Sequence, residues 1–126
     1  MNPQHLVTRT KLLAVGILNM VKELPKVYPS QTMANQLIRA ATSVGANYRS
    51  ACKSKSAKDF IYKMKVVEEE LDETIYWLEL IGETHVYMRD ILTGLHQEAT
   101  ELMLIVIQSL RTVRTNHQKK QSQLHK

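Results

Sequence analysis

Apolar side chains recur along this chain with the period of amphipathic helices, in successive segments separated by short breaks. In the first segment, residues 6–24, apolar positions repeat every three or four residues, and charged residues fall mostly between them. Pro25 and Pro29 end this pattern, because proline lacks an amide hydrogen and restricts the residue before it. The pattern therefore predicts a first helix, a connection, and a second helix that begins at Ser30 or Gln31.

A polar stretch at residues 51–56 separates the second predicted helix from the third. The second helix continues through Tyr48 and carries small residues that allow a neighbouring helix to approach closely. Ser56 followed by Asp59 resembles an N-cap box and predicts the start of the third helix, and Gly82 predicts its end. The apolar positions of the third helix have the spacing of a seam in a left-handed bundle: Phe60, Met64, Val67, Leu71, Ile75 and Leu78.

The last predicted helix runs from about Met88 to Arg114 and contains a segment that is apolar on every side. A helix that is apolar all round has to be buried all round, but each helix of a four-helix bundle keeps one face in solvent. We therefore expect another subunit to cover this segment, which makes it the candidate oligomer interface. Its residues are Leu102, Met103, Leu104, Ile105, Val106 and Ile107.

Length and composition fit a single all-α domain. The chain has 126 residues with 4 Gly and 3 Pro, too few for a loop-rich β fold. We predict an antiparallel up-and-down four-helix bundle over residues 1–115 and a basic, flexible tail over 116–126. The single cysteine excludes a disulfide within the chain, the start lacks a secretory leader, and the longest apolar run is too short to cross a bilayer. These features predict a cytoplasmic protein with no role in a membrane.

Charge is strongly segregated along the sequence. Counting Lys and Arg against Asp and Glu, residues 1–67 carry +9, residues 68–101 carry −9, and residues 102–126 carry +5. Such segregation has two interpretations: a basic surface for an anionic partner, or acidic and basic segments that face each other within or between subunits. The sequence leaves both open.

The best candidate for binding chemistry is a basic stretch interleaved with Tyr48, Phe60 and Tyr62. Cations neutralise phosphates, and an exposed aromatic ring can stack on a base. The same cations can instead pair with carboxylates of the third helix or of a neighbouring subunit. The candidate nucleic-acid-binding residues are Arg39, Arg49, Lys53, Lys55, Lys58, Lys63 and Lys65.

Motifs of catalysis and metal binding are missing from the sequence. The carboxylates of residues 68–73 are dense enough to suggest a di-metal bundle site, but no Glu-x-x-His pair accompanies them. Cys52 has no histidine near it in sequence to act as its base, so a packed or half-exposed thiol is the favoured interpretation. The five histidines occupy termini, loops or polar helix positions and are expected to be solvated. We expect no enzyme, no catalytic residue, no cofactor and no metal.

Several motifs, taken in order, resemble a known family. They are the segment 35–52, Lys55-Ser56, Asp59-Phe60-Ile61, and the segment 70–81 with its Glu70, Glu73, Tyr76 and Trp77. Together they resemble the bacterial four-helix bundle protein family, also called the 23S rRNA intervening sequence proteins. The resemblance spans residues 9–82, and the last helix matches only in character.

This resemblance implies an up-and-down four-helix bundle that assembles as a ring-like homopentamer, and it supplies no established reaction. A similarly folded accessory protein of diversity-generating retroelements binds nucleic acid and a reverse transcriptase. Within the family motif we expect Arg39 or Arg49 to meet Glu70 or Glu73 across the bundle. The leading hypothesis is a non-enzymatic oligomer that binds RNA or DNA through its basic surface without base-specific readout. The alternative is a scaffold that engages an unidentified protein partner.

Overall fold

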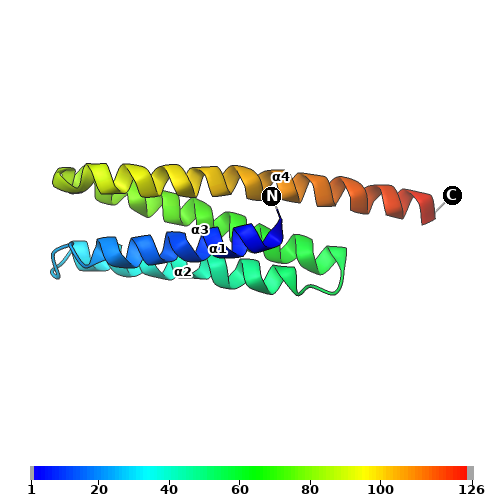
Figure 1. The fold of residues 1–126 in the computed structure, drawn as a ribbon, viewed down its shortest axis with the longest axis horizontal. Coiled ribbons are helices and arrows are strands. Elements are labelled where there is room, and N and C mark those ends of the chain that lie inside the picture. Colours follow the sequence, from blue (N-terminus) through cyan, green and yellow to red (C-terminus); the bar gives the residue numbers. More distant parts are fainter. Residues whose placement is uncertain (1, 125–126) are drawn as a thin grey trace.

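Four α-helices in an up-and-down order make up the chain (Figure 1). The computed structural model describes residues 2–124. Helix α1 covers Pro3–Val21, α2 covers Ser30–Cys52, α3 covers Ala57–Thr84 and α4 covers Arg89–Leu124, with a short 3-10 turn, η1, at Val86–Met88 between α3 and α4. Within the described residues there is no strand. The predicted all-α bundle is confirmed.

Helix starts follow the capping chemistry in the sequence. Asn2 caps α1 by accepting a 3.0 Å hydrogen bond from the backbone N–H of His5, and a proline occupies the first turn, where its missing amide is harmless. Ser56 accepts the N–H of Asp59 at 3.1 Å, which confirms the predicted start of α3. The predicted end at Gly82 is wrong, because α3 continues to Thr84 and Gly82 lies inside the helix.

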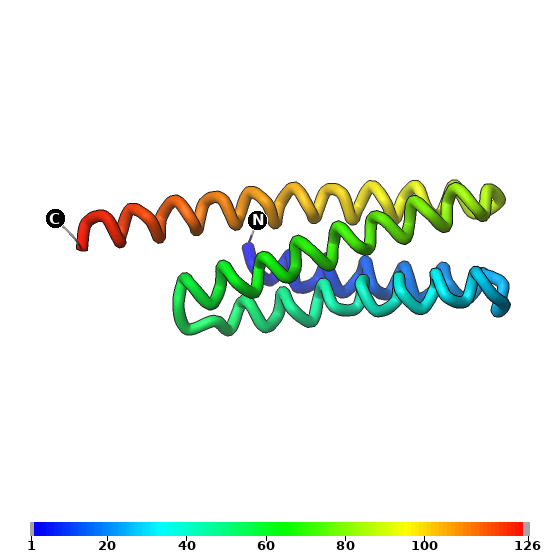
Figure 2. The backbone as a smooth tube through the Cα atoms, turned by 180° about the vertical axis from the view of Figure 1, so that it is seen from behind, coloured from blue at the N-terminus to red at the C-terminus, as the bar shows by residue number. Residues whose placement is uncertain are grey.

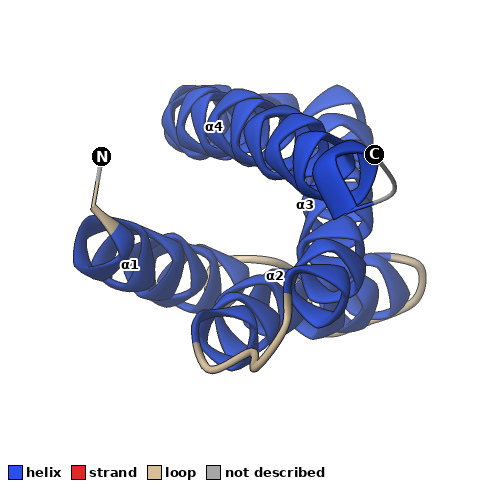
Figure 3. Cartoon of the chain, turned by 90° about the vertical axis from the view of Figure 1, so that its right-hand side faces the viewer, coloured by secondary structure: helices blue, strands red, loops and turns tan. Residues whose placement is uncertain are grey.

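The helices follow one another around an open arc (Figure 3). The most extensive packing joins α2 to α3, whereas α1 packs mainly on α2 and only lightly on α4. Two glycines mark close approaches of α1: a Cβ atom built on Gly45 would lie 3.4 Å from Thr10 Oγ1, and one built on Gly16 would lie 3.0 Å from Leu95 Cδ2. The small residues of α2 therefore allow close packing, as the sequence predicts.

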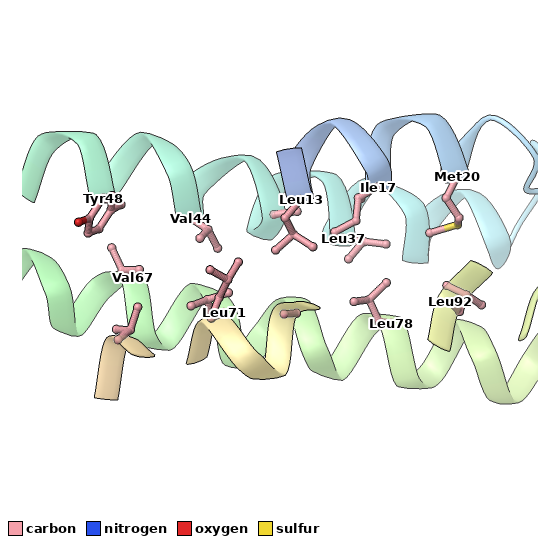
Figure 4. Close-up of a cluster of buried hydrophobic side chains, with 14 of the residues drawn as sticks. Leu13, Ile17, Met20, Leu37, Val44, Tyr48, Val67, Leu71, Leu78 and Leu92 are labelled. Carbon is pink, nitrogen blue, oxygen red and sulfur yellow. The ribbon is translucent and has the colours of Figure 1, made fainter. Parts of the chain in front are cut away.

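All four helices contribute to one apolar core. Figure 4 shows leucine, isoleucine and valine side chains of α1, α2 and α3 facing one another along the bundle axis. The predicted seam of α3 is mostly correct, but Phe60 and Ile75 are only partly buried, and Thr74 is fully buried in the seam. The Thr74 hydroxyl donates to the carbonyl oxygen of Glu70 at 2.8 Å, which satisfies its hydrogen bond inside the core.

Helix α4 is longer than the sequence pattern predicts. It continues as helix to Leu124 rather than ending near Arg114, and it runs past the connection between α2 and α3 (Figure 2). Residues 116–124 of the predicted tail are therefore helical, while 125–126 lie outside the described residues. The last buried residue of α4 is Leu110, and we call the helix beyond it, residues 111–124, the projecting segment.

Candidate nucleic-acid interface

Four of the predicted binding residues gather at the end of the bundle where α2 joins α3. Arg49 lies in the last turn of α2, Lys53 caps that helix, Lys55 lies in the connection, and Lys58 lies in the first turn of α3. All four are exposed, and none lies within 4 Å of a carboxylate oxygen among residues 2–124. We call these four residues the basic end.

The connection at the basic end is built by local hydrogen bonds. The backbone N–H of Lys53 donates to the carbonyl oxygen of Ser50 at 3.1 Å, and that of Ser54 donates to Ala51 at 3.0 Å. The Ser56 cap then starts α3 after only a few residues. Because these hydrogen bonds hold the short connection in place, its lysines project from an ordered backbone.

An exposed aromatic ring accompanies these lysines. Lys58, Tyr62 and Lys65 are spaced by four and three residues on α3, so they share one face of that helix. Tyr62 is 69% exposed, whereas Tyr48 is buried and Phe60 is partly buried in the core. Burial also raises the pKa of the Tyr48 hydroxyl, with a hydrogen bond to Cys52 adding to the effect. Of the three aromatics in the basic stretch, Tyr62 is the one placed to stack on a base.

Arg49 and a second cation line a groove between α1 and α2. The groove has a volume of about 630 Å³ and is lined by Lys11 and Arg49 together with small residues such as Gly45 and Ala46. Arg49 does not pair with α3, so this arginine is not the one that crosses the bundle. Neither cation has a carboxylate partner among residues 2–124, and two such cations on the walls of a groove are suited to a phosphate group.

Arg39 lies away from the basic end and is held by carboxylates of α3. Its Nη1 atom is 3.3 Å from Glu70 Oε2, and its Nη2 atom bonds Glu73, which also accepts from the Trp77 indole N–H. The hydrogen bond from Arg39 holds the pKa of the Glu73 carboxyl below its ordinary value. The expected pairing of Arg39 across the bundle is confirmed, so within one chain this side chain already has two carboxylate partners.

Lys63 and Lys65 are also partly neutralised. Lys63 Nζ is 3.2 Å from Asp59 Oδ2, and Lys65 Nζ is 3.7 Å from Glu68 Oε1, both within α3. Such exposed pairs are weak and open readily in water. Each interpretation of the basic stretch therefore applies to a different part of it. The basic end has no carboxylate partner among residues 2–124, whereas Arg39, Lys63 and Lys65 pair with carboxylates.

Further cations lie outside the predicted basic stretch, on α1 and in the projecting segment. Arg9 of α1 forms a two-pronged pair with Glu98 of α4, with 2.6 Å between Nη2 and Oε1 and 3.1 Å between Nε and Oε2, and Glu101 lies 3.0 Å away. The hydrogen bond with Glu98 raises the pKa of Arg9 further. The projecting segment carries four more cations at the same end of the bundle as the basic end (Figure 1): Arg111, Arg114, Lys119 and Lys120.

The candidate oligomer interface is largely covered within one chain. Leu102 and Val106 are buried in the core, and Met103, Ile105 and Ile107 are partly buried, while Leu104 is 63% exposed. The expectation that a single bundle cannot cover this segment is therefore too strong, because Leu104 is the one residue of the segment that stays exposed.

The histidine interpretation is wrong for His85. This side chain is buried, with its Nε2 atom 2.8 Å from Ser30 Oγ. Cys52 is an exposed free thiol. Within residues 2–124, no three His, Cys, Asp or Glu side chains are grouped to hold a metal ion, and no helix is long and apolar enough to cross a membrane.

Comparison with known proteins identifies the relatives of this bundle. The sequence model of the 23S rRNA-intervening sequence protein family matches residues 4–108. The chain belongs to this family. A solved structure from Bacteroides thetaiotaomicron, a protein of unknown function from the S23 ribosomal protein family, is 32% identical with a TM-score of 0.74. That match covers 83% of this chain and 97% of the other. No curated protein matches.

The family match ends close to where α4 leaves the bundle. Residues 4–108 contain the four packed helices and the basic end, whereas the projecting segment begins at Arg111 and lies beyond the matched part. The family name concerns ribosomal RNA, and the structural relative has unknown function, so the shared bundle identifies the fold and an RNA-related family.

Proposed function

We propose that this 23S rRNA-intervening sequence family member is a non-enzymatic oligomer that binds nucleic acid through its basic end. The observation that carries the proposal is the cluster of four exposed cations without carboxylate partners in the described residues. Cations placed this way bind the phosphate backbone and release its counterions. Three of the four cations of the basic end are lysines, which bind phosphate as point charges, so the basic end favours backbone contact over base-specific readout.

Two further features support this function. Tyr62 stands beside Lys58 on an exposed helix face, where an unpaired base can stack on it. The chain also carries +5 overall, so a homo-oligomer, for which we propose a pentamer, repeats the same weak site several times on one particle. Avidity then gives useful affinity even when each basic end binds weakly.

The test is a salt series of RNA and duplex-DNA binding by the full chain, with its mass in solution measured in the same buffers. The loop variant Lys53→Glu, Lys55→Glu, Lys58→Glu is expected to abolish binding and to leave the mass unchanged. A matched control reverses Lys22, Lys26 and Arg89, which are exposed at the other end of the bundle. This control is expected to retain most of the affinity.

Two results contradict the proposal: no binding by the wild type at low salt, or equal losses in the loop variant and the control. A protein-interaction scaffold is the second candidate, and the exposed apolar side chains Leu12 and Val15 of α1 and Leu104 of α4 favour it. Under that function the loop variant behaves as the wild type does or fails to assemble.

A further inference from the structure

The projecting segment packs little on the rest of the bundle, and only its first turn lies beside Glu68 of α3. No residue from Arg111 to Leu124 is buried, and Val113 and His117 are only partly covered. At 1.5 Å per residue it amounts to about 20 Å of helix. An isolated helix of this length is marginal in water, so its stability depends on the packed part of α4 that precedes it.

The positive charge of the projecting segment favours an anionic partner. After Glu101 the sequence has no Asp or Glu at all, while the segment carries Arg111, Arg114, Lys119 and Lys120. At 100° per residue these four point in different directions around the helix axis, so the positive charge is not confined to one face. This distribution matches a partner that surrounds the helix with anions. The phosphates on both sides of a nucleic-acid groove, or along a folded single strand, are arranged in this way.

A second copy of this chain is a poorer match. Most of its carboxylates already have partners: Asp59, Glu68, Glu70, Glu73, Glu79, Glu98 and Glu101. Among residues 2–124 those with neither a hydrogen bond nor an ion pair to a basic side chain are Glu23, Glu69, Asp72, Glu83 and Asp90, and of these Glu69 and Asp72 lie one turn apart on one helix. A neighbouring copy therefore offers two adjacent anions where the segment brings four cations.

The segment also lies where it can act with the basic end. Figures 1 and 2 show α4 extending beyond the end of the bundle at which the connection between α2 and α3 lies. We propose that the projecting segment is a second phosphate-binding element, which extends the nucleic-acid contact of the basic end along the bundle axis. This inference rests on the proposed function and concerns residues beyond the family match.

The test compares variants that each remove three charges from the full chain. The extension variant is Arg114→Gln, Lys119→Gln, Lys120→Gln, since glutamine keeps a good helix propensity. The control is Lys22→Gln, Lys26→Gln, Arg89→Gln at the other end of the bundle. Binding of a 20-nucleotide single-stranded RNA, a 20-base-pair RNA duplex and the matching DNA duplex is measured across a salt series.

For the extension variant we expect affinity to fall about ten- to hundredfold at 0.1 M salt, with the salt slope on single-stranded RNA reduced by about 2. Hydrogen exchange of the wild type provides a second readout: amides of 111–124 are expected to exchange quickly in the free protein and slowly with RNA bound. The control is expected to change neither quantity by more than a small amount, and the three probes show whether single strands or duplexes are preferred.

The outcomes separate the two proposals. Wild-type binding that the extension variant retains in full, with an unchanged slope, overturns the role of the projecting segment and leaves the basic end intact. Equal exchange of residues 111–124 with and without RNA overturns it as well. Absence of wild-type binding at low salt overturns the proposed function, and with it this inference.

Discussion

Ser30 Oγ lies 2.8 Å from His85 Nε2, which ties the start of α2 to the end of α3 across 55 positions of sequence. The His85 Nδ1 atom is 3.1 Å from the carbonyl oxygen of Ile81. A carbonyl oxygen only accepts, so this contact fits the neutral tautomer with its proton on Nδ1, in which Nε2 accepts the Ser30 hydroxyl. Both side chains are buried, and both ring nitrogens are satisfied.

Ser30→Ala is expected to lower the free energy of unfolding by about 1–3 kcal/mol, because it leaves Nε2 of the buried His85 without a partner. The matched control is Ser54→Ala. The Ser54 hydroxyl is buried without a hydrogen-bond partner in the described residues, so its removal is expected to be neutral or stabilising. Urea unfolding of both variants checks this, and equal losses would contradict the role of the Ser30 hydrogen bond.

Arg39→Gln is expected to lower the free energy of unfolding by about 0.5–1 kcal/mol at pH 7, a small value because Arg39 is 47% and Glu73 37% exposed. Since the pKa of Glu73 is lowered in the fold, the stabilisation is complete above the carboxyl's ordinary value of 4.5. It is lost as the pH falls through the lowered value. Unfolding curves of wild type and variant between pH 7 and pH 3 are therefore expected to converge in acid.

A longer ion pair provides the comparison for Arg39. Lys65 and Glu68 are 3.7 Å apart on the surface of α3, so Lys65→Gln is expected to cost less than about 0.5 kcal/mol. If the difference between the Arg39 variant and the wild type stays constant down to pH 3, the pair with Glu73 does not stabilise the fold.

Two glycine substitutions are expected to differ in effect. A Cβ atom at Gly94 meets nothing within 4 Å, so Gly94→Ala is expected to raise the free energy of unfolding by about 0.5–1 kcal/mol through helix propensity alone. At Gly16 the same atom lies 3.0 Å from Leu95 Cδ2, and the leucine has to move. Gly16→Ala is expected to gain less or to destabilise, as denaturant midpoints will show, whereas equal gains would mean that α1 and α4 are not closely packed at this point.

Leu104→Glu tests the proposed association of chains through the segment 102–107. Leu104 is the most exposed residue of that segment, so the variant is expected to fold normally and to have a lower mass in light scattering. Val27→Glu, at an equally exposed apolar position in the connection after α1, is expected to keep the wild-type mass. A Leu104 variant with unchanged mass would place the interface elsewhere.

Much of the fold is predictable from the sequence because helix period and capping are local. Pro25 and Pro29 bound a connection, and Ser56 caps α3, each through chemistry within a few residues. The end of α4 was predicted too early, since a polar helix without an apolar stripe cannot be told from an irregular tail by periodicity. Gly82 stays inside α3 because nothing there requires a left-handed backbone.

The candidate site was only partly predictable, because pairing depends on how helices are rotated against one another. The pattern of charges identified the basic stretch, but only the packing of α2 on α3 shows that Arg39 meets Glu73 while Arg49 does not. The bond between Ser30 and His85 was missed because two residues so far apart carry no common motif. The alternation of helix directions brings those two chain positions to the same end of the bundle.

Segregation of charge along the helices makes the molecule an electric dipole. Cations of the basic end and of the projecting segment lie at one end of a rod whose longest helix spans about 54 Å, and carboxylates of α3 and α4 lie along its middle and towards its other end. In the field of a polyanion such a rod turns its positive end forward before any contact forms. Orientation before encounter raises the association rate, and it does so most at low ionic strength, where the field reaches furthest.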